Sequence, residues 1–272
     1  MTEKKRKQIL LTNDDGIQSP GLWAAAEALS TLGFVTVAAP REQASATGRS
    51  LPTTSDGRIH ANTLPIGSQK WTVYAVGGTP AQVVLHTVLE IMPTPPDLVV
   101  SGINFGENVG HSVTISGTVG AALEAAAFGI PAMAVSLEVK NLEHIISLSP
   151  EVDFSAAAHF THYFAQRLLQ QRMPDDVDVL KLDVPQGATL QTAWQMTRLA
   201  RHRYYIPIAP NRQSWDEKAY IGGARPEIPK EGLVPGTDIH CLRVDQMVSV
   251  TPLSLDMTSR VELEDLERYL GG

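Results

Sequence analysis

Near its N-terminus the chain reads Ile9-Leu10-Leu11-Thr12-Asn13-Asp14-Asp15-Gly16-Ile17-Gln18-Ser19-Pro20-Gly21-Leu22. The short apolar run at its start is typical of a buried strand. Ser19 is a suitable helix cap, and Pro20 suits the first turn of a helix. The stretch therefore predicts a strand, a tight turn that carries two aspartates, and a helix.

The same alternation continues through the first half of the chain. Apolar strand patterns and Ala- or Leu-rich helix patterns follow each other in regular order. Such a βαβ rhythm predicts a Rossmann-like three-layer α/β fold, with a parallel sheet between helices. The expected strands are 9–12, 34–39, 71–76, 97–100 and 131–137, and the expected helices are 21–32, 81–91 (capped by Thr79) and 119–128.

The second half is less regular. Its patterns predict a helix at 153–171 capped by Asp153, a strand at 177–184, an antiparallel strand within 194–205, paired strands at 238–251 and a terminal helix at 259–270. A long stretch with many Pro and Gly residues usually serves function or interaction. We therefore expect one domain over residues 1–272, with a β-rich C-terminal arm and hairpin at about 203–251, used for oligomer contacts or substrate coverage.

The composition limits the classes of function. The 272 residues carry a formal net charge of −7, which provides no general attraction to nucleic-acid backbones or anionic membranes. No signal-peptide pattern and no apolar run of membrane-spanning length is present. Cys241 is the single cysteine, so it cannot form an intrachain disulfide. A cytoplasmic protein with a packed Cys241 is the expectation.

Four loops follow predicted parallel strands and should meet at one edge of the sheet. They carry oxygen and amide groups, with one histidine among them, which suits Mg²⁺, Mn²⁺ or Ca²⁺ better than zinc. Two adjacent carboxylates repel each other unless a cation lies between them or one is protonated. The alternative, that Asp14 and Asp15 are turn or capping residues, stays open. The side chains include Asp14, Asp15, Ser45, Asn104, Asn108, Ser116 and Thr118.

One of these loops could also bind an anion. Ser116-Gly117-Thr118-Val119-Gly120 leads directly into a predicted helix, whose first N–H groups and nearby hydroxyls could hold a phosphate. The stretch is not followed by Gly-Lys-Ser/Thr, and no G-x-G-x-x-G follows the first strand. Neither a Walker A motif nor a dinucleotide fingerprint is therefore indicated.

In combination these motifs resemble the SurE (survival protein E) family of metal-dependent nucleotide phosphatases. The resemblance covers roughly residues 9–137 and returns weakly near the C-terminus. It rests on five ordered stretches, Leu11-Thr12-Asn13-Asp14-Asp15-Gly16-Ile17, Ala39-Pro40-Arg41-Glu42-Gln43-Ala44-Ser45-Ala46-Thr47-Gly48, Gly78-Thr79-Pro80-Ala81, Ser101-Gly102-Ile103-Asn104-Phe105-Gly106 and Ser116-Gly117-Thr118-Val119-Gly120-Ala121-Ala122.

The resemblance implies a nucleotidase that removes phosphate from nucleoside monophosphates, at the 5′ or the 3′ position. It implies one divalent cation per subunit, most simply Mg²⁺ or Mn²⁺, held by Asp14, Asp15, Ser45 and Asn104. We expect Asp14 and Asp15 to be catalytic. The phosphate would be held by Asn108, Ser116, Gly117 and Thr118. The family also implies a homodimer or homotetramer with exchanged C-terminal segments.

The chain departs from the family's pattern at three places. His111-Ser112 stands where many members carry an Asp or Asn doublet, and Ala44 precedes Ser45 as in only some members. Lys181-Leu182-Asp183-Val184-Pro185 replaces the family's Asn-Val-Asn-Val-Pro. Two other classes therefore stay open: a module that binds nucleotide or metal without turnover, and an interaction protein whose acidic pair is structural.

Overall fold

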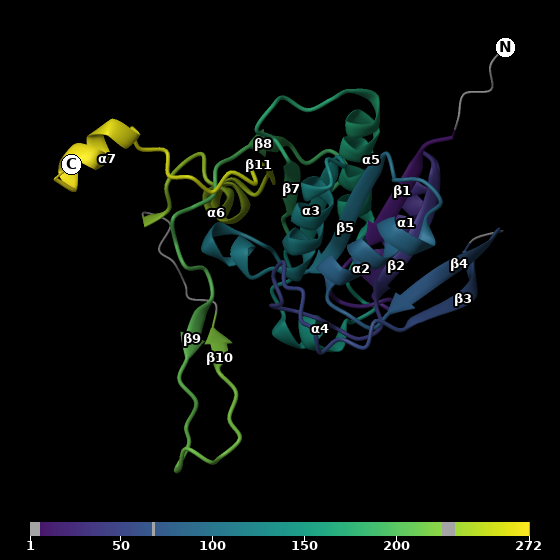
Figure 1. The fold of residues 1–272 in the computed structure, drawn as a ribbon, viewed down its shortest axis with the longest axis horizontal. Helices are drawn as coiled ribbons and strands as arrows, with labels where there is room; N and C mark the ends of the chain where they lie inside the picture. Colours follow the sequence, from purple (N-terminus) through teal and green to yellow (C-terminus); the bar gives the residue numbers. More distant parts are fainter. Residues whose placement is uncertain (1–5, 67–68, 225–231, 272) are drawn as a thin grey trace.

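The computed structural model describes residues 6–66, 69–224 and 232–271. In these ranges a nine-stranded sheet has the order β3-β4-β2-β1-β5-β6-β7-β11-β8 (Figure 1). Its strands are β1 (Gln8–Thr12), β2 (Phe34–Pro40), β3 (Ile59–Ile66), β4 (Gln69–Val76), β5 (Leu98–Phe105), β6 (Ala132–Leu137), β7 (Val179–Val184), β8 (Trp194–Met196) and β11 (Val248–Leu253).

The six central strands, from β4 to β7, run parallel. β3 lies antiparallel on β4 at one side, and β11 lies antiparallel on β7 at the other. The predicted Rossmann-like α/β class is confirmed. Because the strands are parallel, the loops after β1, β2, β4 and β5 come to one edge of the sheet, as expected.

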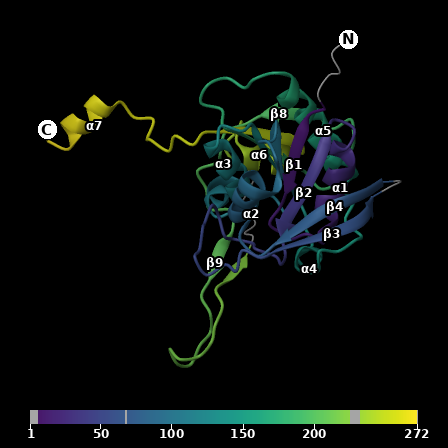
Figure 2. The ribbon, with the colours of Figure 1, turned by 45° about the vertical axis from the view of Figure 1, so that its right-hand side comes forward.

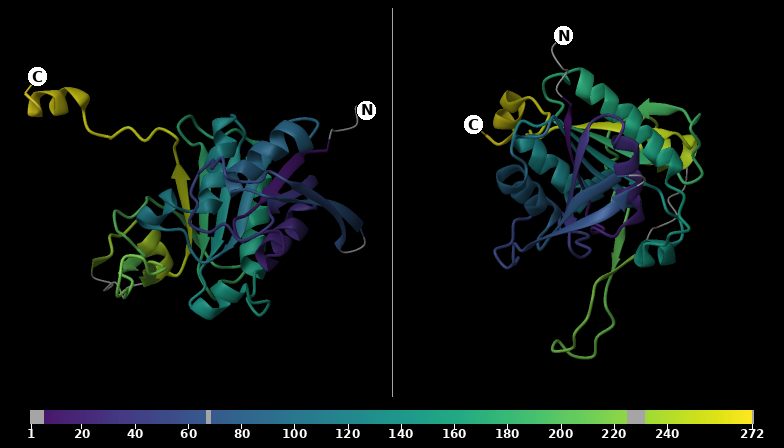
Figure 3. Two further views of the ribbon diagram at one scale, coloured as in Figure 1. Left: turned by 60° about the horizontal axis from the view of Figure 1, so that its bottom comes forward. Right: turned by 90° about the vertical axis from the view of Figure 1, so that its right-hand side faces the viewer.

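Helices cover both faces of the sheet (Figure 3). α1 (Pro20–Leu29) packs with α5 (Ser155–Gln170) on one face, around Leu22 and Phe160. α2 (Pro80–His86), extended by the π-helical η1 (Thr87–Ile91), packs with α3 (Gly117–Ala127) on the other. The core is therefore two apolar layers, one on each side of the sheet. Two short helices, α4 (Leu142–Ser147) and the 3-10 helix η2 (Gly110–Thr114), lie in the connections.

The prediction of paired strands at 238–251 is wrong. The first part is helical, as α6 (Asp238–His240) and the π-helical η4 (Cys241–Asp245), and only β11 is a strand. Ile239 and Leu242 lie three positions apart, so a helix buries both of them in a small cluster with Val109 and Tyr204. Packing of these apolar side chains accounts for the helix.

The prediction of an antiparallel strand within 194–205 is also wrong. Only β8 forms there, and it pairs parallel to β11. After β8 the chain turns toward α6, where the Ala200 N–H donates to Asp238 Oδ1 at 2.8 Å. The Ala200 N–H is therefore bonded to a side chain of α6 and not to a strand of the sheet.

Two segments extend away from the body (Figures 1 and 2). One is the hairpin of β9 (Ile206–Ile208) and β10 (Gly222–Ala224), which lies within the predicted arm. The other is α7 (Leu263–Tyr269), near the end of the chain. Residues 225–231 of the predicted arm lie outside the described residues. Within the described ranges, none of the helices has the length and apolar character needed to cross a membrane.

Candidate active site

The Asp14–Asp15 turn lies directly after β1. Asn13 closes this turn, since its Nδ2 donates to the Gly16 carbonyl at 3.1 Å and its Oδ1 accepts from the Gly16 N–H at 3.2 Å. Gly16 has a φ of +97°, which favours glycine. Both aspartates are only 4% exposed. The turn therefore carries a buried pair of carboxyl groups, rather than the solvated or capping residues of the alternative.

Asp14 faces the N-terminus of α3. The Thr118 hydroxyl donates to Asp14 Oδ1 at 2.5 Å, and the backbone N–H groups of Gly117 and Thr118 also donate hydrogen bonds to this carboxylate. Burial raises the pKa of Asp14, and these hydrogen bonds only partly oppose that effect. A helix N-terminus favours negative charge, so α3 holds Asp14 in place.

Asp15 faces the end of β5. Its Oδ2 accepts the Phe105 N–H at 3.0 Å, and the Gln43 side chain also donates a hydrogen bond to the Asp15 carboxyl group. Burial, together with the charge of Asp14, raises the pKa of Asp15 to about 8. The donors to both carboxyl groups are neutral, so a divalent cation would relieve their repulsion. The pair therefore fits the predicted metal.

The other two predicted metal ligands are sequence neighbours of residues that hydrogen-bond to this pair. The Ala44 N–H donates to the Asp14 carbonyl at 2.8 Å, which brings the loop of the exposed Ser45 to the turn. Asn104 precedes Phe105, and its Nδ2 donates to the Gly106 carbonyl at 2.6 Å, so Oδ1 is the atom that a cation would bind. No three His, Cys, Asp or Glu side chains are grouped for a metal within the described ranges, so neutral oxygen ligands would complete the set.

The predicted phosphate-binding residues fall into two groups. Gly117 and Thr118 contact Asp14, and Ser116 caps α3 by accepting the Val119 N–H at 3.1 Å. Asn108 is held differently: its N–H donates to Asp183 Oδ1 and its Nδ2 to Ser136 Oγ, both at 2.8 Å. Its contacts therefore run to β7 and β6.

A buried ion network also lies at this edge of the sheet. Lys181 Nζ contacts Asp183 Oδ2 and, at 3.4 Å, Asp238 Oδ2. Burial lowers the pKa of Lys181, but the two carboxylates outweigh it and leave the pKa raised, so Lys181 is charged. Burial raises the pKa of Asp183, and Lys181 opposes this. Sequence reasoning missed the network, although the departure at Lys181 was a signal of it.

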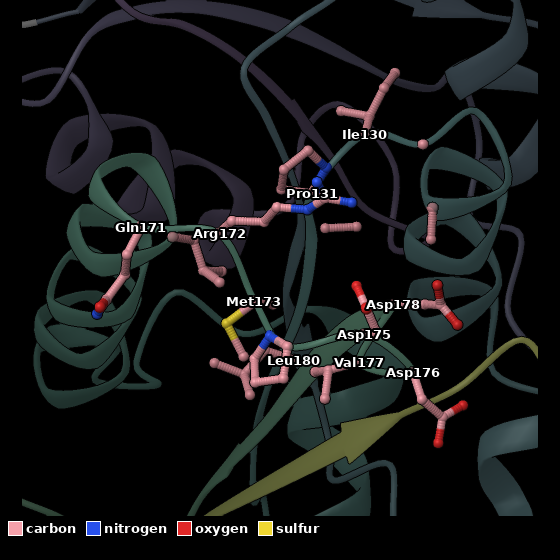
Figure 4. A pocket seen from close by; sticks show the side chains of 15 residues that line it. Ile130, Pro131, Gln171, Arg172, Met173, Asp175, Asp176, Val177, Asp178 and Leu180 are labelled. Carbon is pink, nitrogen blue, oxygen red and sulfur yellow. The ribbon is translucent and has the colours of Figure 1, made fainter.

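Two cavities show where a ligand has room. An open cleft of about 430 Å³ borders the Asp pair, since Gln43 and Ala44 line it with Arg41 and Thr79. A second pocket, of about 250 Å³, is lined by residues that include Ile130, Arg172 and Asp178 (Figure 4). It lies at the amino ends of β6 and β7, opposite the aspartates, and is therefore not part of the candidate site.

The fold and these side chains define a Rossmann-like α/β protein with a buried carboxylate pair beside a helix N-terminus. The model of the family "Survival protein SurE" matches residues 9–206. A "5'-nucleotidase SurE" from Thermococcus gammatolerans is 42% identical over 97% of this chain and 96% of its own length. A "5'-nucleotidase SurE" from Archaeoglobus fulgidus is 40% identical over 97% of this chain and 98% of its own length. The crystal structure of the SurE protein from Aquifex aeolicus has a TM-score of 0.73 and 30% identity, and covers 97% of this chain and 100% of that one. The chain belongs to the SurE family.

Proposed function

We propose that the chain is a metal-dependent nucleotidase that hydrolyses nucleoside monophosphates, at the 5′ or 3′ position, to nucleoside and phosphate. One observation carries the proposal: a buried Asp14–Asp15 pair at the carboxyl edge of the sheet, in a chain related over almost its whole length to proteins named 5'-nucleotidase. The cofactor would be one divalent cation per subunit, Mg²⁺ or Mn²⁺.

Four oxygen-bearing side chains would hold this cation: Asp14, Asp15, Ser45 and Asn104. The chemistry that such a cation supplies when bound is polarisation of the phosphoryl oxygens and acidification of the attacking water. Thr118 and the first turn of α3 would keep Asp14 in position for this task. One of the two aspartates would accept a proton from the water.

The phosphate would be held by Asn108, Ser116, Gly117 and Thr118. These residues combine an amide, two hydroxyls and a helix N-terminus, all of which favour the negative charge of a phosphoryl group. The Thr118 hydroxyl donates its single hydrogen to Asp14, so it could donate to the phosphate only in exchange for that bond, whereas the Ser116 hydroxyl accepts the Val119 N–H and still has a hydrogen to donate. The bordering cleft gives the nucleoside a place to bind.

Phosphate release from a panel of nucleoside monophosphates tests this function. Release should stop with EDTA and return with Mg²⁺ or Mn²⁺. Asp14→Asn and Asp15→Asn should each abolish it without loss of the circular dichroism spectrum. Near wild-type turnover in either variant would contradict the catalytic role. Nucleotide binding without release would support the non-catalytic module instead.

Three broader expectations belong to the same proposal. Residues 1–272 would form one domain, and the arm at about 203–251 would make the contacts of a homodimer or homotetramer. A cytoplasmic location is consistent with the single cysteine. The net charge of −7 still argues against a nucleic-acid duplex or an anionic membrane as partner.

A further inference from the structure

The ion network of Lys181, Asp183 and Asp238 lies outside the predicted metal ligands. All three side chains are fully buried, and they come from β7 and α6, which are far apart in the sequence. A buried charge is costly unless it is paired and hydrogen-bonded. Lys181 offsets the repulsion between the two carboxylates, so the three side chains depend on one another.

Besides pairing with Lys181, each carboxylate accepts a hydrogen bond from the backbone of one short segment, residues 106–110. Asp183 Oδ1 accepts the Asn108 N–H at 2.8 Å, and Asp238 Oδ2 accepts the Gly110 N–H at 2.9 Å. Hydrogen bonds to ionised acceptors are among the strongest in proteins. The network therefore fixes this segment at two points that are two residues apart.

The same segment is joined to the candidate site at its other end. The Phe105 N–H donates to Asp15, and residues 106–110 lead on through η2 to Ser116 at the cap of α3. Asn108 lies in the middle of the segment, with its side chain on Ser136. A shift of residues 106–110 would move Asn108 relative to Asp15.

We propose that Lys181, Asp183 and Asp238 form an ionic clamp that positions Asn108 for the phosphate of the substrate. The three residues act through the segment at 106–110 and are positioning residues. The clamp rests on the proposed function, because the phosphate is the ligand assigned to Asn108. It also gives a physical reason for the departure at 181–185: Lys181 and Asp183 form an ion pair where the family pattern has two asparagines.

Asp183→Ala tests the clamp without leaving an unbalanced charge. The variant removes the acceptor of the Asn108 N–H, while Lys181 stays paired with Asp238. We expect faster amide exchange at residues 106–110 and about a tenfold weaker Kd for inorganic phosphate in the metal-loaded protein, measured by calorimetry. Asp183→Asn keeps an acceptor at 183 and leaves Lys181 paired with Asp238, so it should largely restore both readouts.

Arg243→Met is the matched control. It breaks a different ion pair near α6, since Arg243 Nη1 lies 3.0 Å from Oε1 of the buried Glu138. A role limited to stability would lower the melting temperature of both Asp183→Ala and Arg243→Met and leave the phosphate Kd unchanged. A wild-type Kd or wild-type exchange in folded Asp183→Ala overturns the clamp, and so does failure of Asp183→Asn to restore them. The absence of phosphate release from wild type would instead overturn the proposed function, since exchange and Kd are measured without turnover.

Discussion

At the scale of single residues, Gly117 leaves no room for a side chain between α3 and Asp14. A Cβ there would lie 2.7 Å from Asp14 Cβ and 2.9 Å from Asp14 Oδ2. Gly117→Ala must therefore displace a carboxylate, and a displacement near 1 Å can cost about a hundredfold in rate. We expect kcat/KM to fall by about that factor, with the fold retained. Gly232→Ala is the control, because its added Cβ would meet no atom of the described residues within 4 Å. Wild-type kcat/KM in Gly117→Ala would contradict the account.

Cys241 gives a prediction about pH. Burial raises the pKa of its thiol to about 12, from an ordinary value of 9.0. The folded protein should therefore not react with Ellman's reagent between pH 7 and pH 9, whereas the unfolded protein should. Because the folded pKa is the higher one, the stability that this thiol contributes is complete below pH 9 and declines as pH rises from 9 toward 12. Rapid labelling of the native protein at pH 8 would refute this.

At the scale of elements, α2 begins with a capping box. Thr79 accepts the Gln82 N–H, and the Gln82 side chain accepts the Thr79 N–H at 3.0 Å. The Thr79 hydroxyl also donates to the Ser50 carbonyl at 2.7 Å. Thr79→Ala should lower the free energy of unfolding by about 1–2 kcal/mol, as measured by urea denaturation. Thr258→Ala, at an exposed position, should change it little. Equal effects of the two variants would show that the cap contributes nothing.

The sequence predicted the elements that have a strong local pattern. β1, β2, β4, β5 and β6 are apolar runs in the parallel part of the sheet, and Thr79 has cap chemistry that can be read locally. The edge strand β3 was not predicted, because its mixed composition is not a strand pattern. Its pairing with β4 cannot be read from its own residues. The helical turns at 238–245 depend on packing against Val109 and Tyr204, which are distant in sequence.

The candidate site divides in the same way. Asp14, Asp15 and the start of α3 were predicted to meet, because parallel strands bring their following loops to one edge. The contacts of Asn108 could not be predicted. They depend on Asp183, 75 residues later, and Asp183 in turn depends on Lys181 and Asp238. A buried charge in a strand is a local anomaly, but its partners become known only when the chain is folded.

At the scale of the whole molecule, two segments leave the body (Figure 2), and both carry exposed apolar side chains. Trp215, in the loop of the β9–β10 hairpin, is 91% exposed, and Tyr269 in α7 is 85% exposed. Exposed apolar surface of this kind usually marks an interaction site. A second copy of the chain is the partner that the predicted oligomer would provide.

The oligomer is tested by charging the hairpin. Trp215→Asp together with Tyr220→Asp places two carboxylates where we expect contact with another subunit, and desolvating them would oppose association. Light scattering after size exclusion should give a dimer or tetramer for wild type and a smaller species for this variant. The control is Leu89→Asp, a charge at a position on the body that is 69% exposed, and it should leave the mass unchanged. A monomeric wild type would contradict the predicted oligomer, and an unchanged mass in the hairpin variant would exclude the hairpin from the interface.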